Sequence, residues 1–298
     1  MLEAVEQCML TWIKEFENDE IYELFTHLPH GKRLRAKLVL KIAGESTEAI
    51  RLAAIIELIH AASLLHDDVI DEALTRRGVT SVNASDGSKV AVMIGDVLYS
   101  KAFTELVSFD DKIAKAVASA VTTLSIGEYV DVKMGETFND DEVAYLDMIY
   151  KKTAALIEVT AYCAAVLVGK EADDYKLYGK NLGLAFQIID DILDIVSDEA
   201  TLGKPALNDY KEGKTTLPYM YLYKALNETD KKRLKLAHLK TLDSDESLWI
   251  KAQMKEHKSV EMSYALAREL SDEAISAVRV HEEVELVAIL EEMMRRSF

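Results

Sequence analysis

Residues that interrupt helices are scarce in this sequence, which contains 3 prolines and 12 glycines in 298 residues. Ordinary proteins contain roughly 5% proline and 7% glycine. The evenly spaced tight turns of a β-sandwich or β-barrel are therefore disfavoured. Hydrophobic residues make up 49% of the chain, enough to bury a large core. We expect an all-α protein.

Positive charge is also in short supply, because 35 Lys and Arg residues face 52 Asp and Glu residues, for a net charge of −17. Binding to nucleic acid requires a broad basic surface, so we expect no nucleic-acid partner. Small anions require only a local cluster of cations and are not excluded. The two cysteines, Cys8 and Cys163, lie far apart and predict free thiols in a reducing compartment.

Long apolar runs are missing as well. The longest run, at about residues 159–169, is shorter than the roughly 20 residues that a membrane-spanning helix needs. The first six residues lack the basic start of a signal peptide. We therefore expect a cytoplasmic protein with no transmembrane segment.

Helical periodicity, in contrast, is present from one end of the chain to the other. Apolar residues recur three or four positions apart, and several segments are apolar nearly all round, as in the interior of a bundle. We predict helices over residues 50–71, 90–106, 113–134, 142–168 and 173–196. The expected architecture is one domain over residues 1–298, a single large bundle of mostly antiparallel helices.

Two Asp-Asp-x-x-Asp motifs lie inside strongly apolar stretches, and they consist of Asp67, Asp68 and Asp71 and of Asp190, Asp191 and Asp194. Residues four apart share one face of a helix, so each motif presents two carboxylates to one place. Such hard oxygen ligands suit Mg²⁺, which often bridges carboxylates and substrate phosphates. A solvated acidic face is the ordinary alternative. Carboxylates beside a core are costly unless paired or bound to metal, which favours a metal site.

Basic residues gather around the first motif. Lys32, Arg33 and Arg35 precede an apolar helix, and Arg76 and Arg77 follow the motif closely. His60 lies seven residues, or two helical turns, before Asp67 and on the same face. Each group taken alone would be an ordinary surface charge or a core histidine. Beside a metal site in an acidic protein they favour a diphosphate site, because Arg binds phosphate oxygens in pairs.

Taken in order, these motifs resemble those of the trans-isoprenyl (polyprenyl) diphosphate synthase family. The likeness is carried by residues 31–35, 56–78, 152–153, 186–191, 202–204 and 212–216. The sequence departs from the family pattern at Ala36, where proline is usual, and at Asn208, where an acidic residue is frequent. The resemblance implies an isoprenoid synthase fold around a central active-site cavity, and a homodimer.

The resemblance also implies a reaction, in which isopentenyl diphosphate is condensed with an allylic diphosphate such as farnesyl diphosphate, with Mg²⁺ as cofactor. Isopentenyl diphosphate would be bound by Lys32, Arg35, His60 and Arg77. The allylic diphosphate would be bound by Arg76, Lys152, Lys204 and Lys214. Thr153 and Gln187 would line the reaction centre. Magnesium would be held by Asp67, Asp71 and Asp190, and Asp68 belongs to the same catalytic set.

Product length is expected to depend on Ala62 and Ser63, five and four residues before Asp67. Short-chain family members often carry Phe or Tyr at one of these positions, whereas small residues leave a tunnel open. We therefore predict a long product near octaprenyl, with geranylgeranyl or farnesyl as the alternative. Small residues at these two positions could also serve only to let helices pack closely. A class I terpene cyclase and a non-catalytic subunit of a heteromeric synthase also stay open. Cyclases usually lack the second Asp-rich motif, and such subunits typically lack one.

Overall fold

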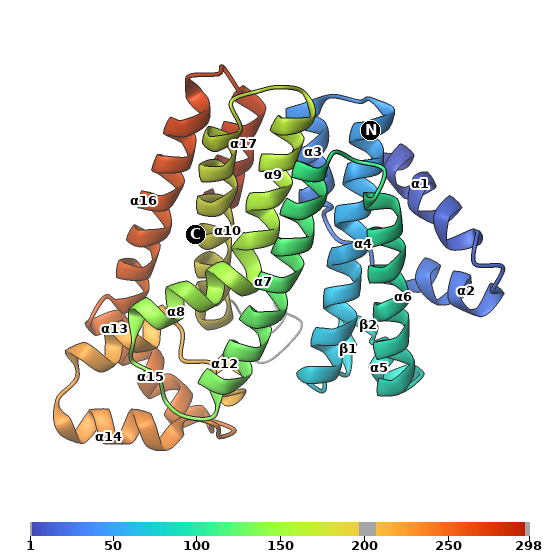
Figure 1. Ribbon diagram of the computed structural model, residues 1–298. Helices are drawn as coiled ribbons and strands as arrows, with labels where there is room; N and C mark the ends of the chain where they lie inside the picture. Colours follow the sequence, from blue (N-terminus) through green and yellow to red (C-terminus); the bar gives the residue numbers. More distant parts are fainter. Residues whose placement is uncertain (1, 197–206, 296–298) are drawn as a thin grey trace. The chain divides into compact units, whose positions relative to one another are not determined.

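The computed structural model describes residues 2–196 and 207–295, and this part of the chain is helical apart from one short hairpin (Figure 1). The all-α fold predicted from the sequence is confirmed. The early elements are α1 (Leu2–Lys14), α2 (Asp19–His27), α3 (Leu34–Ala43), α4 (Thr47–Ile70), β1 (Thr75–Arg76), β2 (Val79–Thr80), α5 (Val82–Ser85) and α6 (Ser88–Leu106). The middle elements are α7 (Asp111–Gly135), α8 (Glu142–Ile149), η1 (Tyr150–Ala154), α9 (Ala155–Leu167) and α10 (Ala172–Val196). The late elements are α12 (Asn208–Lys211), α13 (Leu217–Ala225), α14 (Glu228–Ala237), α15 (Ser244–Glu256), α16 (Ser259–Arg279) and α17 (Val284–Arg295).

The chain forms two compact units. The first comprises Met1–Val121 and Val159–Lys176, and the second comprises Thr122–Glu158 and Leu177–Phe298. Helices α7, α9 and α10 each contribute residues to both units. The assignment of residues 1–298 to a single domain stays a prediction.

Helix α4 is the centre of the first unit, where it packs against α1, α3 and α6 (Figure 1). Its start is fixed by Ser46, whose Oγ accepts a hydrogen bond from Ala49 N at 3.1 Å. Of the described helices, α4 alone is long and apolar enough to cross a membrane, with a mean hydropathy of 1.5 over 18 residues. Because 67% of that window is already buried inside the protein, α4 is a core helix.

The hairpin after α4 fixes the position of two arginines. Strands β1 and β2 pair Thr75 with Thr80 and Arg76 with Val79. Arg77 (φ 53°) and Gly78 (φ 77°) form the connection. Positive φ at both central residues is the signature of a type I′ turn, which matches the twist of paired strands. The two strands are therefore joined by a tight turn, with Arg77 at its first central position.

The helix predicted over residues 142–168 is interrupted by a π-helix. Helices α8 and α9 flank η1, and Ala155 N–H bonds to Tyr150 O, five residues back. A Cβ added at Gly127 of α7 would lie 2.3 Å from Lys152 N, and one at Gly183 of α10 would lie 2.5 Å from Ala154 Cα. The π-helix is therefore packed tightly between two glycine-bearing helices of the second unit. Such segments occur frequently at functional sites.

The short helix α12 is anchored by aromatic packing in the second unit. The rings of Tyr210 and Tyr219 stack with centroids 4.2 Å apart, and Tyr210 OH donates to Leu234 O at 2.7 Å. After α12 the chain turns at Gly213, which has φ 89° and whose carbonyl lies 2.8 Å from His238 Nε2. These contacts fix the backbone just before Lys214.

Candidate active site

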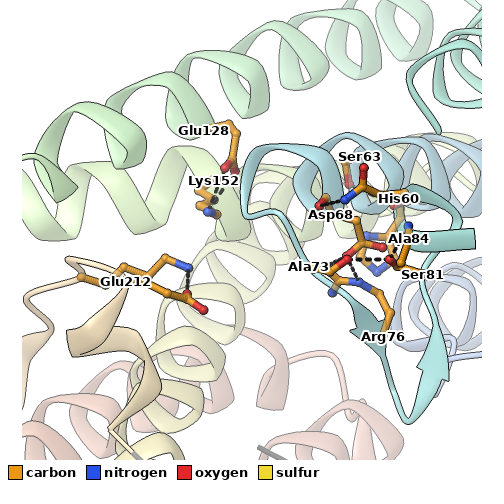
Figure 2. A network of polar contacts seen from close by, with 12 residues as sticks. His60, Ser63, Asp68, Ala73, Arg76, Ser81, Ala84, Glu128, Lys152 and Glu212 are labelled. Carbon is orange, nitrogen blue, oxygen red and sulfur yellow. Dashed lines mark hydrogen bonds and ion pairs between the residues drawn. The ribbon is translucent and has the colours of Figure 1, made fainter. Parts of the chain in front are cut away.

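The first aspartate motif forms the end of α4. Asp67 is partly exposed, and Asp71 is exposed at the helix C-cap, where its N–H donates to Asp67 O at 2.8 Å. Asp68 is only 4% exposed, and its Oδ1 lies 2.6 Å from both Nε and Nη2 of Arg76 (Figure 2). Asp68 thus binds the hairpin, while the outer carboxylates Asp67 and Asp71 lie one helical turn apart nearer the surface.

The donor set of Asp67 and Asp71 fits magnesium. Magnesium is usually bound through one or two protein carboxylates and completes its coordination with water and substrate phosphate oxygens. Among the described residues, no group of three or more His, Cys, Asp or Glu side chains could hold a metal by itself. A magnesium ion at this motif would therefore complete its coordination with water or substrate oxygens.

The second motif, on α10, also has its middle aspartate inside the protein. Asp190 is exposed, whereas Asp191 and Asp194 are buried. Asp194 Oδ2 accepts a hydrogen bond from Asp209 N at 3.2 Å, which ties the motif to α12. Burial, followed by the charge of Asp209, raises the pKa of Asp191 well above its ordinary value. Asp190 is the one member of this motif with an exposed side chain.

Asp191 belongs to a chain of hydrogen bonds across three elements. Tyr145 OH on α8 donates to Asp191 Oδ2, and Gln187 Nε2 donates to Asp191 Oδ1 at 2.9 Å. Thr153 Oγ1 on η1 then donates to Gln187 Oε1 at 2.7 Å. The structure therefore brings Thr153 and Gln187 into contact, and Asp191 fixes the orientation of the Gln187 amide. That these two residues line the reaction centre stays a prediction.

Lys152, next to Thr153 on η1, lies against two carboxylates of α7. Its Nζ is 3.0 Å from Glu128 Oε2 (Figure 2). The same Nζ is 2.5 Å from Asp131 Oδ2. Burial by itself would lower the pKa of Lys152, but Asp131 and Glu128 outweigh it and raise the pKa, while the charge of Lys214 opposes them. Lys152 is therefore positively charged, and its pKa responds to the charge of Lys214. Lys204, the other lysine expected beside them, lies outside the described residues.

Basic groups in the first unit converge on His60. Burial lowers the pKa of His60 well below its ordinary value, and the charges of Arg35, Arg77, Arg33 and Arg76 lower it further. Burial likewise lowers the pKa of Arg35 to about 10. Among the described residues, nothing accepts a hydrogen bond from the buried Arg35 Nε. The arginines repel one another, and the buried Arg35 Nε has no acceptor among the described residues, so an anion would be stabilised at this cluster.

A glycine makes room for Arg77 in this cluster. Arg77 Nη1 donates to Pro29 O at 3.1 Å, and a Cβ at Gly31 would come within 2.5–2.8 Å of the Arg77 guanidinium. The structure thus brings together Arg35, His60 and Arg77 of the four residues expected to bind isopentenyl diphosphate. The fourth, Lys32, is exposed on the same loop.

The residues expected to set product length are both buried in α4. Ala62 is completely buried, and Ser63 Oγ donates to His60 O at 2.9 Å, so its hydroxyl is satisfied by its own helix (Figure 2). The apolar residues one and two turns earlier, including Ile59 and Ile55, are buried as well. The buried residues Ile55, Ile59 and Ala62 are therefore apolar, and Ser63 adds only a small side chain.

Several residues of these clusters received no role of their own from the sequence: Glu57, Glu128, Asp131, Tyr145 and Asp191. Glu57 and Asp191 carried a usable signal, because each is a charge inside an apolar run. Glu128 and Asp131 carried none, since two acids three residues apart on a helix are typical of a solvated face.

Comparison with known proteins establishes the family. The polyprenyl synthetase family profile matches residues 18–254. The chain belongs to the polyprenyl synthetase family. It is accordingly a trans-prenyl diphosphate synthase, a prenyltransferase of isoprenoid biosynthesis.

Relatives of this polyprenyl synthetase differ in product. The crystal structure of octaprenyl pyrophosphate synthase from Helicobacter pylori is 42% identical, with a TM-score of 0.94, over 100% of this chain and 98% of that chain. Geranylgeranyl diphosphate synthase of Sulfolobus acidocaldarius is 35% identical over 86% of this chain and 82% of its own length. A polyprenyl synthase of Caulobacter crescentus, crystallised with calcium and isoprenyl diphosphate, is 27% identical, with a TM-score of 0.90, over 100% of this chain and 94% of that chain. Family membership therefore leaves product length open.

Proposed function

We propose that this enzyme adds isopentenyl diphosphate units to an allylic diphosphate such as farnesyl diphosphate, with Mg²⁺, and stops near octaprenyl length. The observation that carries the length is the pair of small buried residues Ala62 and Ser63 on α4. Neither side chain can fill the space that a Phe or Tyr ring would fill. The octaprenyl synthase of Helicobacter pylori, at 42% identity over the whole chain, supports the same product.

The cation cluster around His60 is proposed to bind isopentenyl diphosphate. Arg35, His60 and Arg77, with Lys32 on the loop before α3, would supply the contacts. A doubly charged phosphate group would relieve the repulsion that lowers the pKa of His60 and would accept from the buried Arg35 Nε. Both effects favour binding of this anion.

The remaining basic residues are proposed to bind the allylic diphosphate: Arg76, Lys152, Lys204 and Lys214. Asp67 and Asp71, and separately Asp190, would hold magnesium, with Asp68 setting the position of Arg76. Calcium bound with isoprenyl diphosphate in the Caulobacter crescentus relative supports a divalent cation. Bound magnesium would offset negative charge on the departing diphosphate.

The reaction then requires that an allylic carbon–oxygen bond breaks and that the isopentenyl double bond attacks the resulting cation before water reaches it. The new cation must then lose a proton, for which the released diphosphate would be the base. The charges of Lys152, Lys204 and Lys214 would stabilise the negative charge that develops on the leaving group. Because the Thr153 hydroxyl donates to Gln187, its oxygen lone pairs are directed away from that bond and can face a cation. The buried apolar residues of α4 would keep water from the growing chain.

Product analysis tests this function. The pure protein is incubated with labelled isopentenyl diphosphate, farnesyl diphosphate and magnesium, and the products are sized by chromatography. Long polyprenyl diphosphates support the proposal, and geranylgeranyl diphosphate would support the alternative suggested by the Sulfolobus acidocaldarius relative. A cyclic hydrocarbon would indicate a cyclase, and no product from the protein alone would indicate a subunit.

The metal assignment is tested by Asp67→Ala and Asp190→Ala. Each should lose on the order of 3–4 kcal/mol of transition-state stabilisation, a fall of several hundred-fold in kcat, by analogy with other electrostatic sites. Asp111→Ala removes an exposed carboxylate on α7 and should leave kcat unchanged. Full wild-type activity in EDTA would contradict the magnesium requirement.

A further inference from the structure

Glu57 is an acidic residue near the middle of α4, a helix that is buried over most of its length. It lies between Ile56 and Leu58 on α4 and is only 2% exposed. An ionised carboxylate is strongly unfavourable in such a place unless it is paired and hydrogen-bonded. Residues three apart lie on one helix face, so Glu57 stands beside His60 and its cation cluster.

The two oxygens of Glu57 hold the chain on either side of Arg35. Oε1 accepts a hydrogen bond from the backbone N–H of Ala36 at 2.9 Å, and Oε2 accepts one from Arg33 Nη1 at 3.1 Å. Arg33 has φ 51°, the left-handed region, and is the N-cap of α3. Glu57 therefore ties both the cap of α3 and its first turn to α4, with Arg35 between the two ties.

The charge of Glu57 also acts on the cluster that it faces. It opposes the lowering of the pKa of both Arg35 and Arg77 that burial and neighbouring cations cause. Without a negative group here, the guanidinium groups would repel one another while no substrate is bound. Glu57 thus keeps the arginines gathered before an anion arrives.

The hydrogen bond from Ala36 depends on the residue type at position 36, where this sequence departs from the usual family pattern. Where the resembling family usually has proline, residue 36 is alanine and retains its N–H. Proline has no N–H to donate. The substitution therefore provides an anchor for Glu57 that proline could not make.

We propose that Glu57 is a positioning residue for isopentenyl diphosphate. It does not contact the substrate; it holds Arg35 in the orientation that binds the diphosphate, through Ala36 and Arg33. The inference rests on the proposed function, because it takes isopentenyl diphosphate as the anion of this cluster.

The test is Glu57→Gln, assayed by steady-state kinetics with each substrate varied in turn. Glutamine keeps the shape but removes the charge and places an amide N–H₂ against one of two donors. The KM for isopentenyl diphosphate should rise about tenfold or more, with the KM for farnesyl diphosphate changed less than about twofold. In an Arg35→Gln background the same substitution should change the isopentenyl diphosphate KM less than about twofold, because residues that act as one unit are not additive.

Glu6→Gln is the matched control. Glu6 Oε1 binds the opposite side of the same arginine, Arg33 Nε, at 2.6 Å, but makes no tie to α3 through Ala36. Both KM values should stay within about twofold of wild type. An effect equal to that of Glu57→Gln would show that the charge on Arg33, not the anchoring of Arg35, is what matters, and would overturn the proposal.

If Glu57→Gln does not fold, Arg33→Gln tests the proposal in its place. It removes the hydrogen bond between Arg33 and Glu57 by changing Arg33, and it should raise the KM for isopentenyl diphosphate selectively. Equal rises in both KM values, no rise, or a full effect in the Arg35→Gln background would each overturn the role of Glu57. These results are distinct from failure of the proposed function, which would appear as no prenyl product from the wild-type enzyme.

Discussion

His60 shows, at the scale of a single residue, how burial sets protonation. Its pKa in the folded protein lies well below the ordinary value because of burial and four neighbouring arginines. An unfolded histidine takes up its proton at about pH 6.5. Below that pH the unfolded state therefore binds a proton that the folded state does not, and the free energy of unfolding falls as the pH falls.

We therefore expect the wild type to lose more stability than His60→Gln between about pH 7.5 and pH 5.5, with no difference in slope above that window. Urea unfolding of both proteins across this range measures the effect. His257→Gln, at the C-cap of α15, is a control for loss of a histidine elsewhere. Identical pH dependence in wild type and His60→Gln would show that His60 is not held neutral.

Gly31 is a second informative residue, because its lack of a side chain leaves space for the Arg77 guanidinium. Gly31→Ala would place Cβ within 2.5–2.8 Å of the Arg77 guanidinium, the flexible end of a side chain. Arg77 should move, so the KM for isopentenyl diphosphate should rise several-fold, to roughly the value for Arg77→Ala. The melting temperature should change little, because no backbone atom is displaced. A further rise of KM when Gly31→Ala is added to Arg77→Ala would contradict this explanation.

How far single residues could be predicted depends on the kind of signal that they carry. Helical spacing in the sequence correctly placed Asp67 and Asp71 one turn apart at the end of α4. Spacing could not show that Asp68 and Asp191 face inward, because adjacent residues differ in orientation by about 100° and either one can meet the core. Their partners come from distant segments, which a single sequence does not reveal.

The π-helix η1 is the element that positions Lys152 and Thr153. Gly127→Ala or Gly183→Ala would drive a Cβ into the backbone of η1, at 2.3 Å from Lys152 N or 2.5 Å from Ala154 Cα. Each should destabilise the protein by about 1–3 kcal/mol, the usual range for overpacking, and should lower kcat as Lys152 shifts. Thermal melting and kinetics measure the two effects.

Gly135→Ala is the matched control on the same helix as Gly127, since its Cβ would meet its nearest neighbours at 3.7 Å or more, an ordinary contact. It should leave both melting temperature and kcat close to wild type. A fully stable and active Gly127→Ala would mean that η1 adapts without cost, against the tight packing described above.

Helix α4 is expected to act as the wall of the product tunnel. Ala62→Tyr places a ring at a completely buried position, so elongation should stop early and yield farnesyl or geranylgeranyl products. Ser63→Ala, which removes only a hydroxyl bonded to His60 O, is the control and should keep the long product. Chromatography of the products decides. Unchanged length in Ala62→Tyr, or a wild type that already stops at farnesyl, would contradict the tunnel hypothesis.

The long helices were predictable from the sequence, and the irregular elements were not. The predicted helix over residues 90–106 corresponds to α6 (Ser88–Leu106), and that over 173–196 to α10 (Ala172–Val196), because burial of one helix face leaves a period of 3.6 residues. A five-residue π-helix is too short to alter that period, and so η1 was read as ordinary helix. The β1–β2 hairpin has strands of two residues each, too short to show alternation.

For the whole molecule, the family resemblance implies a homodimer. Helix α7 carries exposed apolar side chains on successive turns, Ile126 (47%), Tyr129 (64%) and Val132 (45%). Such a patch is typical of an interaction surface. We predict sedimentation as a dimer, with Tyr129→Lys shifting the protein towards monomer. Val280→Lys, at an exposed position after α16, should not do so. A monomeric wild type at micromolar concentration would contradict the prediction.

The apolar length of α4 has a consequence during synthesis. The helix is hydrophobic enough to resemble a membrane span, and most of it is concealed only by packing. Its principal neighbour, α6, follows it in the chain. Until α6 has been synthesised, α4 lacks that cover, and apolar surface exposed on an incomplete chain is prone to aggregate and to bind chaperones. The helix at the centre of the first unit is thus also a segment at which the nascent chain is open to aggregation.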